Sequence, residues 1–253
     1  MERIAVTGAA GLIGRLLVAD LGTDYDVLAL DRTWRSGSLR RRQDTRRIGF
    51  AATEFTGAHT VIDLAADARL DAPWRSVLEG NVPATVAAFE AAHRAGVRRV
   101  IFASSHHVVG MYERDEPYAS ICAGHYDGLD PAAIPKLTSA HPIRPDSPYG
   151  VGKAAGEAAG RFFAEEHGVS VICLRIGTVY PQDRPGSTRG FAKLLTRADL
   201  LRLVRACITA PPDVGFAVLY GVSANTWRFW DIEEARRLVG YEPRDDAERW
   251  RVP

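Results

Sequence analysis

Short apolar runs alternate with helical segments along most of the chain. Runs typical of buried strands lie at residues 3–7, 26–30, 61–66, 100–105, around Cys173 and at 216–220. Helical patterns lie between and after them, at residues 12–21, 78–95, 149–167, 199–206 and from an Asp231 N-cap to 238. This alternation predicts an α/β protein with a doubly wound parallel sheet and helices on both faces. Residues 33–60 are polar and poorly periodic, which indicates a loop with a short strand and helix.

A glycine-rich turn joins the first predicted strand to the first helix. Its glycines are Gly8, Gly11 and Gly14, with Leu12 and Ile13 between the last two. Glycines at a strand-to-helix turn permit close approach of a pyrophosphate, whose charge then meets the free N–H groups of the helix start. The motif predicts a Rossmann-type dinucleotide site.

Asp31 follows the second predicted strand, 23 residues after Gly8. A carboxylate at this place accepts hydrogen bonds from the adenosine ribose and repels a 2′-phosphate, which favours NAD over NADP. The adjacent Arg32 supports the opposite choice, since an arginine here can receive the phosphate.

Tyr149 and Lys153 lie one turn apart on the same face of the predicted helix 149–167. A cation beside a phenol favours the phenolate, so this spacing predicts a general base. Ser104 and Ser105 end the strand 100–105. Because the carboxyl ends of parallel strands meet at one edge of a sheet, we expect the serines and Tyr149 to meet there.

Composition limits the partners. Lysine and arginine number 32 and acidic residues 31, a net charge of +1, so no overall field favours nucleic acid or a membrane surface. Three cysteines show no metal-ligand spacing, and no metal is expected. Neither a signal peptide nor a long apolar segment is visible, and we expect a cytoplasmic protein with a small-molecule substrate.

The combination of motifs resembles extended short-chain dehydrogenases/reductases of the NAD-dependent epimerase/dehydratase family. It comprises the glycine turn, residues 63–66, residues 81–85, Ser104-Ser105, Tyr149 with Lys153, and residues 174–177. Within this family the chain is most similar to uronate dehydrogenases, through residues 102–105 with His107, and residues 144–147, 175–177, 220–225 and 230–231.

The resemblance implies roles for individual residues. Ser105, Tyr149 and Lys153 would be catalytic, with Lys153 lowering the tyrosine pKa. Residues implied at the cofactor, besides the glycine turn and Asp31, are Leu64, Ala65, Ala66, Asn81, Tyr149, Lys153 and Ile176. Residues implied at the substrate are Ser105, His106, Thr178 and Arg189, the last as the fork that grips a carboxylate.

Three departures from the uronate dehydrogenase pattern concern the substrate, and one is Ala68, which falls near where those enzymes offer a serine. His106 stands where those enzymes carry an asparagine, and it is either a sugar ligand or a histidine that only supports the site. The stretch between Ser105 and Tyr149 is longer than in those enzymes, and the excess lies at residues 113–141. This excess is either a lid over the site or a surface insertion. Trp227, Phe229 and Trp230 either roof the substrate pocket or pack the C-terminal segment onto the sheet.

These features predict one domain, in which residues 1–181 bind NAD and carry the catalytic groups and residues 182–253 form a small substrate-binding portion. The expected function is NAD-dependent oxidation of a hexuronate at the anomeric carbon to an aldarolactone. The alternatives are a nucleotide-sugar epimerase or dehydratase, and a non-catalytic NAD-sensing regulator. The resemblance also implies a homodimer formed through a helix pair that includes residues 149–167.

Overall fold

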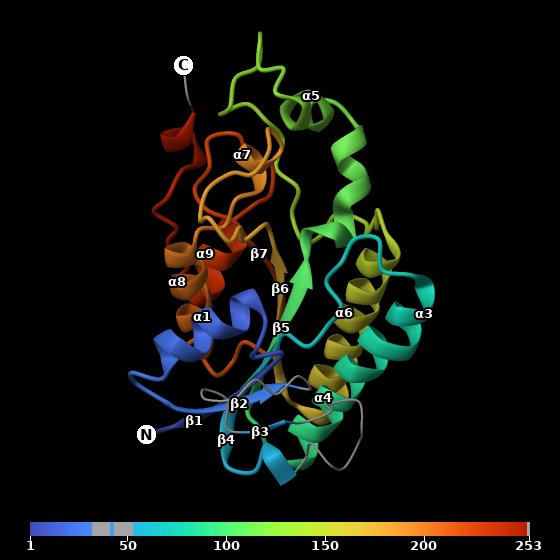
Figure 1. The fold of residues 1–253 in the computed structure, drawn as a ribbon, viewed down its shortest axis with the longest axis vertical. Helices are drawn as coiled ribbons and strands as arrows, with labels where there is room; N and C mark the ends of the chain where they lie inside the picture. Colours follow the sequence, from blue (N-terminus) through green and yellow to red (C-terminus); the bar gives the residue numbers. More distant parts are fainter. Residues whose placement is uncertain (32–40, 43–52, 252–253) are drawn as a thin grey trace.

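A computed structural model describes residues 1–31, 41–42 and 53–251. Its centre is a parallel sheet of seven strands in the order β3-β2-β1-β4-β5-β6-β7 (Figure 1). The strands are β1 Arg3–Thr7, β2 Asp26–Asp31, β3 Arg41–Arg42, β4 Ala58–Asp63, β5 Arg99–Ser105, β6 Ser170–Ile176 and β7 Phe216–Gly221. The predicted doubly wound Rossmann-type sheet is confirmed.

Helices cover both faces of this sheet. They are α1 Leu12–Leu21, α3 Trp74–Ser76, α4 Val82–Arg94, α5 Tyr118–Ala123, α6 Pro148–His167, α7 Gly190–Lys193, α8 Arg197–Ile208 and α9 Glu233–Val239. A π-helix, Val77–Asn81, joins α3 to α4, and 3-10 helices lie at His106–Arg114 and Ala247–Trp250. Figure 1 shows α1, α8 and α9 on one face and α4 and α6 on the other. Among these helices, none is long and apolar enough to cross a membrane.

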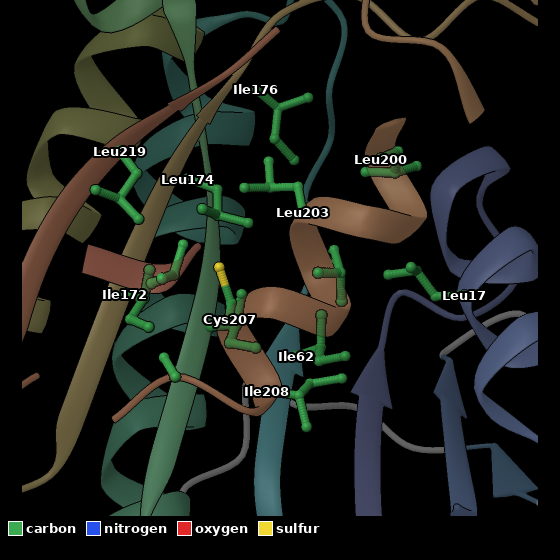
Figure 2. Packing of buried hydrophobic residues seen from close by; sticks show 14 of the residues in the cluster. Leu17, Ile62, Ile172, Leu174, Ile176, Leu200, Leu203, Cys207, Ile208 and Leu219 are labelled. Carbon is green, nitrogen blue, oxygen red and sulfur yellow. The ribbon is translucent and has the colours of Figure 1, made fainter. Parts of the chain in front are cut away.

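The apolar faces of the helices and the strands form the core. On the first face, Leu17 of α1 and the α8 side chains pack onto β4, β6 and β7, as Figure 2 shows. The α8 side chains are Leu200, Leu203, Cys207 and Ile208. On the other face, the Phe89 ring lies 5.9 Å from Phe102 and 5.6 Å from Phe163, centroid to centroid. Residues before and after position 181 share the first cluster, and the functional division at 181 stays a prediction.

Residues 113–141 pack against the C-terminal segment in a third cluster. Tyr118, Ile121, Ile134 and Leu137 are buried there together with Phe229 and Trp230. The Leu137 N–H donates to the Phe229 carbonyl at 2.7 Å, and the Asp231 N–H donates to the Leu137 carbonyl at 2.9 Å. The stretch is therefore an ordered part of the fold, and the two aromatic rings pack this region.

Three predicted boundaries were wrong. The helix expected at 78–95 begins at Trp74, because the π-helical turn continues α3 into α4. The strand expected at 61–66 ends at Asp63. Ile232, and not Asp231, is the N-cap of α9, although the Asp231 carboxylate accepts from the Glu234 N–H at 3.2 Å. Most of the loop predicted at 33–60, and Arg32, lie outside the described residues.

Candidate active site

A cavity of about 790 Å³ lies at the carboxyl ends of the central strands. It brings together every residue that the sequence assigned to the cofactor, the chemistry or the substrate, except Arg189. These are Gly8, Gly11, Leu12, Ile13, Gly14, Asp31, Leu64, Ala65, Ala66, Asn81, Ser105, His106, Tyr149, Lys153, Ile176 and Thr178. Other lining residues, which the sequence did not single out, include Asp67, Gly80, Tyr180 and Lys193.

The glycine turn leaves one end of the cavity open. Gly8 has a φ of 65°, and a Cβ there would lie 2.9 Å from the Leu64 carbonyl group. A Cβ on Gly14 would lie 2.4 Å from the Gly8 oxygen. Gly11, the N-cap of α1, has no side chain to occupy the N–H groups of the first turn. These backbone groups fit a dinucleotide pyrophosphate.

Asp31 ends β2 beside this turn. Its Oδ2 accepts from the Ala10 N–H at 3.0 Å, and the residue lines the cavity. The carboxylate therefore holds the turn and faces the place expected for the adenosine ribose. This position supports the choice of NAD.

A second set of hydrogen bonds fixes the backbone that follows β4, at another part of the cavity. The Thr7 hydroxyl donates to Asp63 Oδ1 at 2.6 Å and accepts from the N–H groups of Leu64 and Ala65 at 3.2 and 3.3 Å. The Asn81 side chain accepts from the Asp67 N–H at 2.7 Å and donates to the Asp67 carbonyl at 3.0 Å. Asn81 thus fixes the backbone loop that follows Ala66.

Helix α6 brings the tyrosine and the lysine to the cavity. Ser147 is the N-cap, its hydroxyl accepting from the Gly150 N–H at 3.1 Å, and Pro148 is the first helical residue. Tyr149 and Ser105 both line the cavity, and the Ser105 side chain acts to lower the pKa of the phenol. A phenol and a hydroxyl therefore line the same cavity.

Burial has the largest effect on the pKa values of Tyr149 and Lys153. Burial raises the pKa of Tyr149 to about 12, and the Ser105 side chain only partly opposes this. The Lys153 ammonium lies 5.7 Å from the centroid of the Tyr149 ring and 4.7 Å from that of Phe102. Burial lowers the pKa of Lys153 to about 8. Desolvation is thus the largest influence on the phenol, and the lowering of the Tyr149 pKa by Lys153 stays a prediction.

Ser104 is turned away from the chemistry. Its hydroxyl donates to Glu157 Oε1 at 2.6 Å. Arg175 donates to both oxygens of the same carboxylate, at 2.9 and 2.8 Å, and to the Tyr220 hydroxyl at 3.0 Å. This buried network joins α6 to β5, β6 and β7. Of the two serines, only Ser105 acts on the Tyr149 phenol.

The two histidines after β5 have different partners. His106 Nδ1 lies 3.2 Å from the Ile176 carbonyl, which can only accept, so the proton lies on Nδ1. Burial lowers the pKa of His106 well below its usual value, and the ring is neutral. Its Nε2 is a buried acceptor that has no hydrogen-bond partner among the described residues. His107 Nδ1 contacts the Asp146 carboxylate at 2.7 Å.

Arg189 does not reach the cavity. Its Nε and Nη2 form a two-pronged ion pair with Glu113, and the Nη2 to Oε1 distance is 2.6 Å. Sequence reasoning missed this pair because the two residues are 76 positions apart. Lys193, four residues after Arg189, lines the cavity instead. The scarcity of lysine in the sequence could have pointed to Lys193. The chain has three lysines, and two of them, Lys153 and Lys193, line this cavity.

No group of three or more potential metal ligands occurs in the part of the chain that the structure describes. The site consists instead of a glycine cradle, a ribose-facing carboxylate, and a tyrosine, serine and lysine around one point. This arrangement fits a nicotinamide dinucleotide cofactor.

Comparison with known proteins agrees with this geometry. Residues 4–204 match the model of the NAD dependent epimerase/dehydratase family. An NAD-dependent glucose-6-phosphate dehydrogenase of Haloferax volcanii is 35% identical over 97% of this chain and 94% of its own length. An L-arabinose 1-dehydrogenase (NAD(P)(+)) of the same organism is 36% identical over 98% of both chains.

The chain is also similar to a solved structure over nearly its whole length. The uronate dehydrogenase of Agrobacterium tumefaciens superposes with a TM-score of 0.82 at 26% identity, over 99% of this chain and 87% of that one. The predicted similarity to uronate dehydrogenases is confirmed, as is the prediction of an NAD-dependent enzyme. The chain belongs to the NAD-dependent epimerase/dehydratase family of extended short-chain dehydrogenases/reductases.

Proposed function

We propose that the enzyme oxidises the anomeric hydroxyl of an aldose, with NAD as the acceptor, and releases the lactone. The observation that carries this proposal is that Tyr149, Ser105 and Lys153 line the same cavity as the glycine turn. Two hydroxyls placed in this way fit one substrate oxygen, with Tyr149 as base and Ser105 as hydrogen-bond partner. NAD, when bound, accepts the hydride from the anomeric carbon.

The residues around Tyr149 supply what the base needs. Its pKa of about 12 in the free protein must fall for proton transfer near neutral pH, and each pKa unit corresponds to about 1.4 kcal/mol. Lys153 is the nearby cation, and the buried Asp63 carboxylate favours its charged form. The 9% exposure of Tyr149 keeps bulk water away, which strengthens these interactions.

The proposal covers aldoses as a class and does not single out the hexuronates. The expectation of a hexuronate came from the resemblance to uronate dehydrogenases, with Arg189 as the carboxylate ligand, and this guanidinium is paired with Glu113. Relatives that share about a third of their residues with this chain are named for glucose 6-phosphate and for arabinose. A neutral pentose and a phosphorylated hexose thus belong in the test beside the uronates.

The test is a panel of substrates, each offered with NAD and with NADP. It contains arabinose, glucose, glucose 6-phosphate, glucuronate, galacturonate and UDP-glucose, with nicotinamide absorbance as the readout and the lactone identified by mass spectrometry. Oxidation of at least one free aldose to its lactone is expected. If only the nucleotide sugar is converted, the epimerase or dehydratase alternative replaces the proposal.

A further inference from the structure

Lys193 places a positive charge inside the cavity. Its side chain is 6% exposed and lines the same wall as His106, Thr178 and Tyr180. The described residues provide neither a hydrogen bond nor an ion pair for its ammonium. A cation that lines a cavity without a bonded carboxylate is available to a ligand, so its position indicates a role at the site.

The nearest acidic groups are already paired with other residues. Glu113 binds Arg189 through both oxygens and has a side chain only 9% exposed. Asp146 contacts His107 at 2.7 Å. Glu113 and Asp146 favour the charged form of Lys193 through space, whereas burial and Arg189 lower its pKa to about 8. Near neutral pH the ammonium is therefore protonated, and no protein carboxylate is bonded to it.

The same contact occupies part of the Arg189 guanidinium. Its Nε and Nη2 donate to Glu113, and Arg189 does not line the cavity, whereas Lys193 does. Arg189 is instead an internal support for the 3-10 helix His106–Arg114, which carries Glu113.

The backbone fixes Lys193 near the chemistry. The Thr178 N–H donates to the Lys193 carbonyl at 2.7 Å, and the Leu195 N–H donates to the Thr178 carbonyl at 2.9 Å. Thr178 follows the end of β6 by two residues. The lysine is thus held at the sheet edge where Ser105 and Tyr149 also lie.

His106 adds an acceptor to this wall. Its neutral ring presents Nε2 as a buried lone pair that lacks a partner among the described residues, and Lys193 contributes to keeping the ring neutral. A cation and a neutral acceptor on one wall match a sugar that carries both an acidic substituent and hydroxyl groups.

We propose that Lys193 binds an anionic substituent of the aldose, a carboxylate or a phosphate. This inference rests on the proposed oxidation of an aldose and narrows its substrate to acidic sugars. Because Arg189 is paired with Glu113, Lys193 is the cation that distinguishes acidic sugars from neutral ones.

Steady-state kinetics with glucose, glucuronate and glucose 6-phosphate test the proposal, because these sugars share their ring stereochemistry. The wild type should have the higher kcat/KM with one or both acidic sugars. Lys193→Met should lower that value about 10- to 100-fold, mainly through KM, as expected for loss of a hydrogen bond to a charged group. The kcat/KM for glucose should change less than about twofold, and Lys193→Arg should restore most of the preference.

Lys136→Met is the matched control. Lys136 does not line the cavity, and its ammonium donates to the Arg228 carbonyl at 2.7 Å, so this variant removes the same charge elsewhere. Its preference for acidic sugars should equal that of the wild type. If Lys193→Met keeps the wild-type preference, or if glucose is the better substrate of the wild type, Lys193 is not the anion ligand, although aldose oxidation would stand. If no aldose is oxidised, the proposed function itself fails.

A binding measurement tests the site without turnover. Because the chain has three lysines, carbon-13 labelling of lysine at Cε gives three methylene signals, which Lys193→Arg and Lys136→Met assign. With NADH present, glucuronate or glucose 6-phosphate should shift the Lys193 signal and raise its titration midpoint, whereas glucose should leave the midpoint unchanged. Binding of the acidic sugars without any change at Lys193 would overturn the proposal.

Discussion

The buried carboxylate Glu157 connects the catalytic helix to the sheet. It lies one turn after Lys153 and two turns after Tyr149, on the same face of α6. Both of its oxygens accept from Arg175, and Ser104 adds a third hydrogen bond. The two charged side chains are 9% and 3% exposed, so solvent hardly screens the pair.

Arg175→Met removes the positive partner and leaves Glu157 buried with only the serine hydroxyl as a donor. Breaking a buried ion pair in this way costs about 3–5 kcal/mol. For a chain of this size, each 1 kcal/mol lowers Tm by about 2–4 °C, so a decrease of roughly 6–20 °C is expected. Total stability is typically about 5–15 kcal/mol, and the variant should still fold at low temperature.

The assay is a double-mutant cycle measured by urea denaturation and thermal melting. Replacing both partners, Arg175→Met with Glu157→Leu, should recover much of the loss, because an apolar pair leaves no buried charge. The folded single variant should also lose kcat, since α6 carries Tyr149 and Lys153. A cost below about 1 kcal/mol for Arg175→Met, or a double variant as unstable as the two single losses combined, would refute this reasoning.

Other predictions concern the chemistry and the cofactor. Tyr149→Phe should lower kcat by about 10²–10⁴-fold while NAD binding, measured by calorimetry, persists; a variant that kept a tenth of the wild-type rate would remove the phenol from the mechanism. Asp31→Ala should narrow the ratio of kcat/KM for NAD over NADP, and equal use of both cofactors by the wild type would contradict the NAD assignment. The ratio of kcat/KM for acidic over neutral aldoses should fall as pH rises through about 8, because the protonated Lys193 binds the anion. Deprotonation of Lys153, also near pH 8, affects both substrates and cancels in this ratio. A ratio independent of pH between about 6 and 10 would count against Lys193.

Local sequence motifs were sufficient to predict the cofactor-binding half of the site. The glycine turn, Asp31 and residues 64–66 lie where the sequence placed them, because each follows a strand of one parallel sheet. The period of helix α6 likewise placed Tyr149 and Lys153 on one face. In such a sheet the order of strands and helices along the chain determines which strand ends meet.

The substrate half could not be predicted in the same way. The sequence assigned a carboxylate to Arg189 because an arginine occupies that place in the uronate dehydrogenase pattern. The structure pairs it with Glu113, 76 positions earlier in the chain, and leaves Lys193 at the cavity. Residue type alone does not show which acidic group a cation meets when the partner is distant along the chain.

The sequence by itself determined the fold and the cofactor, and it predicted that Tyr149, Ser105 and Lys153 lie at one site. These depend on periodicity, on glycine backbone geometry and on the order of elements along the chain. Only the tertiary structure decided the partner of Arg189, the proton position on His106 and the high pKa of Tyr149. Those depend on burial and on contacts between distant segments, because desolvation and pairing act through space.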